Sequence, residues 1–195
     1  PLYSSAASDV YKRQEENGLI VVYPDSTDFA WNDGREVTGW SPTVEDVDDV
    51  AFVTQLIDQL SADYAIDPAQ VHLAGFANGG LMAFRLACEV PERFDRVLVA
   101  GALAFDYHLD ACPSPQPEPQ TILIAHGTAD SYYKTEGRDV DTPGDNPNTR
   151  ILSVAQTVTW WLDRNRCASD TILDIDSSGA EVYTCLLYTS PSPRD

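Results

Sequence analysis

The sequence predicts an α/β fold, built on a mostly parallel sheet with helices on both faces. Short, continuous apolar runs alternate along the chain with segments whose apolar residues recur at helical spacing, an order typical of βαβ units. The runs lack the apolar–polar alternation of half-exposed strands, which indicates strands buried on both faces. The 195 residues fit one domain, and 43% of them are hydrophobic, enough for a sizeable core.

Four apolar runs are the predicted parallel strands. The first, residues 19–23 (LIVVY), is rich in β-branched residues and is closed by Pro24 and Asp25. The other three lie at residues 71–74, 96–102 and 121–126. Two later runs, residues 171–175 and 181–184, flank a Ser-Ser-Gly turn and predict a β-hairpin.

Three segments carry helical periodicity. From about Val44 to Tyr64 the apolar residues fall on one helical face, Thr43 is a suitable N-cap, and Pro68 follows as a breaker. Residues 79–90 and 151–165 predict two further helices. Residues 26–42, 113–120 and 131–149 are predicted connections, because they are rich in Gly, Pro, Asn, Asp and other polar residues and lack periodicity.

Charge and composition exclude several classes of function. Twelve Lys and Arg stand against thirty-one Asp and Glu, a net charge of −19, which disfavours nucleic acid and anionic membranes as partners. No apolar run approaches the roughly 20 residues of a membrane-spanning helix. The four cysteines lack CxxC spacing and a nearby histidine pair, so no zinc site is expected. Nothing in the sequence indicates an obligate protein partner.

The two ends are expected to be foreign to the protein. Residues 4–14 (SSAASDVYKRQ) and 185–195 (CLLYTSPSPRD) resemble in-frame translations of the two arms of a sequencing adapter. We therefore expect residues 1–14 and 185–195 to be non-native and residues 15–184 to be a fragment of one domain. Such a fragment exposes apolar sheet edges, so we also expect it to associate.

A strand followed by Gly-Phe-Ala-Asn-Gly-Gly and a helix is the most informative stretch. It matches the nucleophile-elbow pattern G-x-S-x-G, with Ala77 where the serine is expected. Glycines at 75 and 79 suit the close approach of strand and helix, and the backbone N–H of Asn78 would face a developing oxyanion. A methyl group cannot attack an ester, so covalent catalysis through Ala77 is absent.

Asp130 follows the last predicted parallel strand in the sequence His-Gly-Thr-Ala-Asp. A carboxylate in this position, about fifty residues after an elbow, fits the chain order of nucleophile, acid and histidine. By itself the residue is equally well explained as the cap of a turn. The elbow upstream favours its interpretation as a triad acid.

Together these motifs resemble the polyhydroxybutyrate-depolymerase and feruloyl-esterase-like branch of the secreted α/β-hydrolases. The matching pieces are LIVVYPD at 19–25, VDDVAFVTQLID at 47–58, VHLAGFANGGLMAFRLACEVPERF at 71–94, HGTAD at 126–130 and SVAQTVTWWLDRNRC at 153–167. The resemblance implies an incomplete α/β-hydrolase fold, an extracellular location and Ser-His-Asp hydrolysis of carboxylic esters, some of them polymeric, without a cofactor. Ala77 then holds the nucleophile position, Asn78 supplies the oxyanion amide, and Asp130 is the triad acid.

The chain lacks several residues on which the activity of that family depends. Ala77 replaces serine, and neither the Gly-Gly-His-type motif with the catalytic histidine nor the early His-Gly oxyanion loop is present. His72, His108 and His126 are interpreted as structural or surface residues. We therefore expect this chain to be inactive. The alternative is a non-catalytic homologue that binds polyester or polysaccharide through the old cleft.

Several further residues have two interpretations. Trp31, Trp40 and the Tyr132–Tyr133 pair follow predicted strand ends, where open α/β sheets bind ligands, so Trp40 and Tyr132 are candidate substrate contacts. Simple packing explains them equally well. Cys88 and Cys112 form either a disulfide, as in secreted proteins, or two buried thiols.

Overall fold

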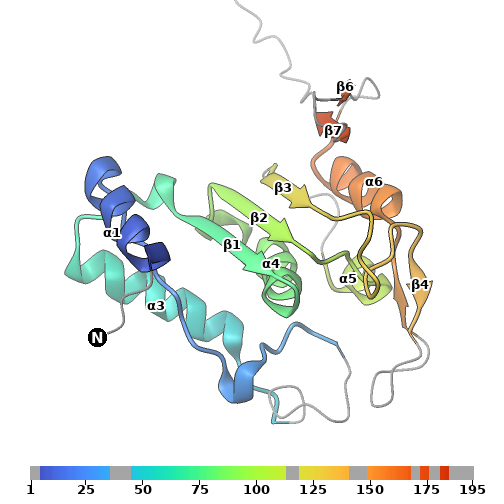
Figure 1. The fold of residues 1–195 in the computed structure, drawn as a ribbon. Coiled ribbons are helices and arrows are strands. Elements are labelled where there is room, and N and C mark those ends of the chain that lie inside the picture. Colours follow the sequence, from blue (N-terminus) through green and yellow to red (C-terminus); the bar gives the residue numbers. More distant parts are fainter. Residues whose placement is uncertain are drawn as a thin grey trace, which may run out of the picture.

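A three-stranded parallel sheet lies at the centre of the computed structural model, which describes residues 5–35, 45–112, 119–140, 149–167, 172–175 and 181–184. Its strands are β1 (His72–Phe76), β2 (Arg96–Ala100) and β3 (Thr121–Ala125), in the order β1-β2-β3 (Figure 1). Phe76 pairs with Ala100 and Ala100 with Ala125, so the three carboxyl ends stand level. The predicted α/β class with a parallel sheet is confirmed.

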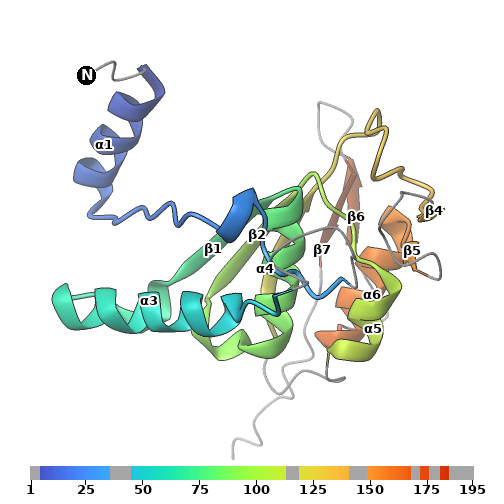
Figure 2. The ribbon, with the colours of Figure 1, turned by 90° about the horizontal axis from the view of Figure 1, so that it is seen from below.

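Helix α4 (Asn78–Glu89) is the central helix of the core. It packs against β1 and β2, and its Phe84 stacks on Trp161 of α6 (Val154–Arg164) and meets His108 of α5 (Asp106–Ala111) edge to face. Helix α3 (Asp49–Asp63) adds Val50, Val53 and Ile57 to the same core (Figure 2). Short apolar strands and one apolar helix thus build the platform that carries the loops.

The two faces of the sheet differ in exposure. Val97 and Val99 on β2 are buried towards α4, whereas Phe76 on β1 and Leu123 on β3 are 74% and 62% exposed. Residues alternate between the faces along a strand, so Phe76, Ala100 and Ala125 share the exposed face. This face is visible in front of α4 in Figure 1.

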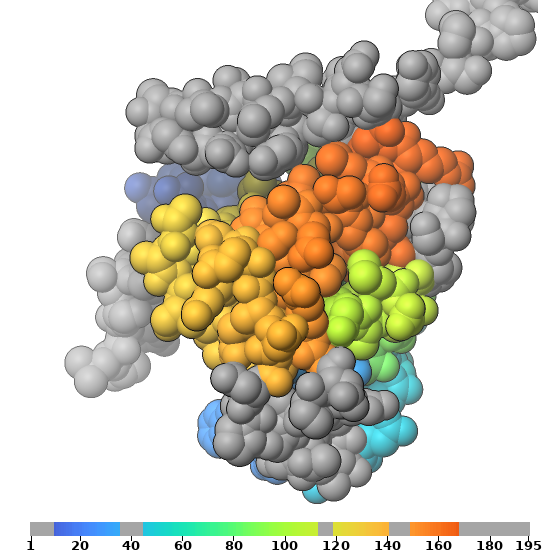
Figure 3. Space-filling view, turned by 90° about the vertical axis from the view of Figure 1, so that its right-hand side faces the viewer, coloured from blue at the N-terminus to red at the C-terminus, as the bar shows by residue number. Residues whose placement is uncertain are grey.

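Smaller elements complete the described residues. Helix α1 (Ser5–Asn17) precedes an extended stretch, and single turns of 3-10 helix lie at Thr27–Phe29, Pro68–Gln70 and Pro91–Arg93. β4 (Arg138–Asp139) pairs antiparallel with β5 (Arg150–Ile151), and Figure 3 shows the segment after β3 packed beside α6. The predicted hairpin is present as β6 (Ile172–Ile175) and β7 (Glu181–Thr184).

The strand predicted at residues 19–23 is wrong. These residues pair with no strand of the described part of the chain, and their side chains are 41–74% exposed. An apolar run becomes a strand only where a neighbour accepts its backbone hydrogen bonds, and here the backbone N–H groups of Leu19 and Val21 instead donate to Gln14.

Helix α3 begins later than the periodicity of residues 44–64 predicts. α3 starts at Asp49, because the carboxylate of Asp48 caps it by accepting a hydrogen bond from the Ala51 N–H at 2.9 Å. The predicted N-cap, Thr43, lies outside the described residues. A carboxylate at the N-cap also interacts favourably with the helix dipole.

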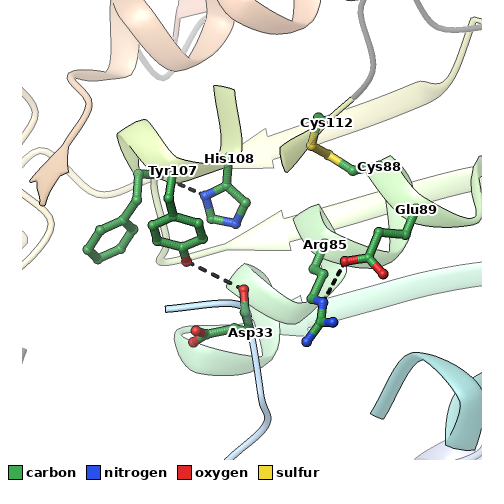
Figure 4. Close-up of a disulfide and its surroundings, with 8 residues drawn as sticks. Asp33, Arg85, Cys88, Glu89, Tyr107, His108 and Cys112 are labelled. Carbon is green, nitrogen blue, oxygen red and sulfur yellow. Dashed lines mark hydrogen bonds and ion pairs between the residues drawn. A yellow bond between two sulfur atoms is a disulfide. The ribbon is translucent and has the colours of Figure 1, made fainter. Parts of the chain in front are cut away.

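Cys88 and Cys112 form a disulfide, which settles the alternative that the sequence left open. The bond joins the last turn of α4 to the residue that follows α5, and both sulfurs are buried (Figure 4). Cys167 is disulfide-bonded as well.

Candidate active site

The bend between β1 and α4 places Ala77 in an unusual backbone conformation. Its φ of 51° and ψ of −117° lie outside the regions that residues with a side chain normally adopt. Three hydrogen bonds hold it there: the Ala77 N–H donates to Ala100 O at 3.0 Å, and Ala77 O accepts from the N–H groups of Gly80 and Leu81, at 2.9 and 3.1 Å. The tight strand-to-helix bend predicted at residue 77 is therefore present.

Gly75 and Gly80 let the strand and the helix approach each other. A Cβ on Gly75 would lie 2.0 Å from Gly79 O, which no side chain can accept. A Cβ on Gly80 would meet Val99 Cγ1 at 3.2 Å on the buried face of the sheet. Gly75 is thus a steric requirement of the bend. The expectation for Gly79 is wrong, because a Cβ there would have Trp31 Nε1 at 3.9 Å, an ordinary contact distance.

Asn78 is the first residue of α4, and its backbone N–H and its side chain differ in their hydrogen bonding. Its backbone N–H, at the positive end of the helix, donates to no atom of the described residues. Its side chain is fully engaged: Oδ1 accepts from the Trp31 N–H at 2.7 Å, and Nδ2 donates to Trp31 O at 3.2 Å and to Asp33 Oδ2 at 2.5 Å. An unoccupied N–H beside residue 77 is the geometry that an oxyanion site requires.

Asp130 lies in the turn after β3. Its Oδ1 accepts hydrogen bonds from the backbone N–H groups of Tyr132 and Tyr133, at 2.9 and 2.8 Å. Its second oxygen, Oδ2, accepts no hydrogen bond from the described residues. Since β1 and β3 are parallel and in register, Asp130 and Ala77 both follow the carboxyl edge of the sheet.

The three histidines of the chain are all engaged elsewhere. His72 pairs with Asp95 at 3.5 Å, and His126 Nε2 lies 2.7 Å from Tyr133 O. His108 is buried, and its Nδ1 accepts from the Phe105 N–H at 3.0 Å, which places its proton on Nε2. Burial lowers the pKa of His108 to about 3, so the ring is neutral and plays a structural part.

A buried ion pair lies next to the bend. Asp33 and Arg35 are joined at 2.8 Å, with only 1% and 6% of their surfaces exposed. Burial opposes the charge on Arg35, but the carboxylate of Asp33 outweighs it and raises the pKa of the guanidinium. Arg35 also lies over the Phe105 ring at 5.6 Å, and the Tyr107 hydroxyl donates to Asp33 O at 3.5 Å (Figure 4).

Sequence reasoning missed this ion pair. Its members lie in a loop without periodicity, and their contacts are some 45 residues away in the chain, at Asn78. The signal in the sequence was weak: Asp33 and Arg35 carry opposite charges two residues apart, shortly after Trp31.

The structure describes some of the aromatic residues that were candidate substrate contacts and not others. Trp40 lies outside the described residues. Tyr132 is half-buried after β3, under the Arg138 guanidinium at 4.6 Å and edge to face with Tyr133 at 4.8 Å. Trp31 stacks on Phe52 with 6.2 Å between centroids, and its Nε1 would lie 3.9 Å from a Cβ on Gly79. Trp31 is thus an aromatic side chain beside the bend.

Neither a metal-ligand cluster nor a membrane-spanning helix occurs in the described part of the chain. No group of three metal-ligating side chains occurs within the described ranges of the chain. In those same ranges, no helix combines the length and the apolar character needed to cross a membrane.

Comparison with known proteins finds relatives of this chain. The chain is 33% identical over 152 residues to "Putative esterase NocK" of Nocardia uniformis subsp. tsuyamanensis, covering 72% of this chain and 41% of that protein. It is 25% identical to Feruloyl esterase B of Piromyces equi, over 94% of this chain and 34% of the relative. It is 26% identical to the bifunctional acetylxylan esterase/xylanase XynS20E of Neocallimastix patriciarum, over 70% of this chain and 19% of that protein.

These relatives are named as esterases, a feruloyl esterase and an acetylxylan esterase, which supports an esterase relationship of the α/β-hydrolase type for this chain. This esterase homologue spans less than half the length of the curated relatives it matches. No family model and no solved structure matches it. The resemblance to esterases seen in the sequence is confirmed, whereas the comparisons do not show its polyhydroxybutyrate-depolymerase part.

Proposed function

We propose that this chain is the central part of a secreted carboxylic-ester hydrolase, with its nucleophile position at residue 77. The single observation that carries the proposal is the strained bend at Ala77, with φ of 51°, between β1 and the first turn of α4. Such a bend raises one side chain above the sheet edge, beside the free N–H groups of a helix N-terminus. The esterase names of the relatives support the same chemistry.

Each position has a defined part in the proposed reaction. A serine at 77 would attack the ester carbonyl after a histidine removes its proton, and the Asn78 N–H would stabilise the oxyanion. Asp130, whose Oδ2 accepts no hydrogen bond from the described residues, would orient that histidine. With Ala77 the attack has no nucleophile, and His72, His108 and His126 are engaged elsewhere. We therefore propose that the chain as it stands does not hydrolyse esters.

The substrate class follows from chemistry shared by the relatives. Feruloyl and acetylxylan appear in their names: feruloyl is an acyl group, and acetylxylan is a polysaccharide that carries acetyl esters. Feruloyl, acetyl and polyhydroxyalkanoate esters are the proposed substrates. The buried Cys88–Cys112 disulfide supports an extracellular location, because such bonds persist in oxidising compartments.

An Ala77→Cys variant tests the nucleophile position without the missing histidine. A thiolate at a helix N-terminus is activated by the dipole. With p-nitrophenyl acetate its sulfur would bond to the carbonyl carbon, p-nitrophenolate would leave, and the thiol proton would pass to solvent. We expect a burst of about one equivalent of p-nitrophenolate, with the acetyl group found on the introduced cysteine by mass spectrometry.

The matched control is Ala69→Cys, on an exposed 3-10 turn. Its thiol should acylate roughly tenfold more slowly, because it lacks an oxyanion site. Equal acylation of the two thiols would refute the proposed nucleophile position. So would an absence of acylation in Ala77→Cys while a disulfide reagent still reaches its new thiol.

The second candidate function is binding without catalysis. Ala77 itself favours it, since a binding protein does not need the nucleophile. Sedimentation of the unaltered chain with insoluble polyhydroxybutyrate or xylan particles tests this function. Depletion from solution by one of them, with none by cellulose, is the expected outcome of a binder.

A further inference from the structure

We infer that Asn78 is a positioning residue: its side chain anchors the start of α4 to residues 31–33 and so fixes the direction of its own backbone N–H beside position 77. This inference rests on the proposed ester chemistry at that position. It assigns a part to the Asn78 side chain and to the Trp31–Asp33 segment, beyond the part proposed for the Asn78 N–H.

The hydrogen bonds of Asn78 are sensitive to small movements of the helix. Oδ1 and Nδ2 bond to the N–H and the C=O of the same residue, Trp31, and Nδ2 also reaches Asp33 Oδ2. A planar amide satisfies all three only in one orientation. A shift of the first turn of α4 by a fraction of an ångström would break at least one of them.

The segment to which Asn78 is anchored is itself held firmly. The Asp33 carboxylate is buried and receives Arg35 Nε and Nη2 as well as Asn78 Nδ2. The Asn32 N–H donates to Asp49 Oδ2 at 2.6 Å, and Arg85 Nη1 donates to Asn32 O at 2.7 Å. Contacts from α3, α4 and α5 thus fix the anchor, and Figure 4 shows Asp33 between Tyr107 and Arg85.

A backbone N–H stabilises an oxyanion best when its direction is already fixed before the reaction. A preorganised N–H costs no reorganisation when charge develops on the carbonyl oxygen. Ala77 gives α4 no side-chain cap, and the Asn78 side chain instead ties the first residue of the helix to a neighbouring segment through Trp31 and Asp33. Loss of the anchor should therefore weaken oxyanion stabilisation more than it weakens the fold.

Two reactions of the Ala77→Cys chain separate these effects. Acylation by p-nitrophenyl acetate passes through a tetrahedral oxyanion, whereas alkylation by iodoacetamide forms a C–S bond and releases iodide without one. Both depend equally on the thiolate fraction and on access. The ratio of the two rates therefore reports the oxyanion site and is insensitive to a general change at the thiol.

Adding Asn78→Ala should lower the acylation rate roughly tenfold while alkylation changes by less than about twofold. Asn78→Asp is the second variant, since it keeps the acceptor for the Trp31 N–H and loses both donated bonds; it should lower the ratio in the same direction. Asn17→Ala is the matched control, because it removes an exposed asparagine amide that donates to Arg13 O, and it should leave the ratio unchanged.

The outcomes are distinct. An unchanged ratio in both Asn78 variants, or a parallel fall of acylation and alkylation, overturns the positioning role and leaves the proposed function standing. Absence of acylation in Ala77→Cys with Asn78 intact removes the proposed function itself. A lowered ratio with retained far-ultraviolet circular dichroism supports the inference.

Discussion

Ala77 adopts a backbone conformation that its own methyl group disfavours. A residue with a Cβ at positive φ costs on the order of 1–2 kcal/mol, which glycine avoids. We expect Ala77→Gly to raise the free energy of unfolding by about 1 kcal/mol in urea titrations of dilute protein. Ala83→Gly, in the middle of the same helix, should instead lower it by about 1 kcal/mol. A loss of stability in Ala77→Gly would contradict the strained bend.

His108 couples stability to pH. Burial among Phe84, Phe105 and the nearby charges of Arg35 and Arg85 lowers its pKa to about 3 from 6.5. Between these values the unfolded chain binds a proton that the folded chain does not, so stability falls as the pH drops below 6.5. From pH 7 to pH 5 we expect a loss of about 2 kcal/mol from this residue.

Urea titrations at the two pH values measure this loss. His108→Asn, whose Oδ1 can still accept from the Phe105 N–H, should remove most of it. His72→Asn is the control, since His72 is 40% exposed, and it should retain the loss. The same pH dependence in all three proteins would show that His108 is not its source.

At the scale of single residues, the local sequence pattern predicts the bend at Ala77. It does not predict the contacts of Asn78 that hold the bend in place. Gly75 helps to predict the tight turn because its steric need arises from Gly79, only four residues away in the chain. The anchor at Asn78 could not be predicted, since its partners Trp31 and Asp33 are distant in sequence and only the fold brings them near.

At the scale of elements, the junction of β1 and α4 depends on Gly75. A methyl group there would meet the backbone of Gly79 at 2.0 and 2.4 Å, and backbone cannot move aside cheaply. We expect Gly75→Ala to lower the free energy of unfolding by at least about 3 kcal/mol. Gly127→Ala, where nothing lies within 4 Å, should change it by less than about 0.5 kcal/mol. Equal urea midpoints for the two variants would contradict the close approach.

The three strands of the central sheet were predicted well. The short paired strands β4 and β5, at positions predicted as a connection and as the start of a helix, were missed. The strands at 71–74, 96–102 and 121–126 appear within two residues of those bounds, because each is flanked by turns and paired in the sheet. Residues 19–23 have a β-propensity similar to that of the sheet strands but no pairing strand among the described residues. The local sequence pattern does not show whether a pairing strand is present. Helix α5 was missed because six residues are too few for a periodic signal.

At the scale of the whole molecule, the exposed face of the sheet favours association. Phe76 and Leu123 lie on this face, and Phe76 belongs to a strand whose outer edge is unpaired within the described chain. We expect the chain to form concentration-dependent oligomers in analytical ultracentrifugation. Leu123→Gln should weaken them, whereas Leu109→Gln, at a 42% exposed leucine on α5, should not. A monomer at all concentrations would contradict this expectation.

The cross-link between Cys88 and Cys112 also sets conditions for making the protein. Both sulfurs end up inside the core, so oxidation has to be completed before α4 and α5 close over them. A host cytosol that keeps thiols reduced would deliver a chain lacking this covalent tie, whose two ends are 24 residues apart. Periplasmic export, or refolding in a glutathione redox couple, is therefore the route by which material for every experiment above should be prepared.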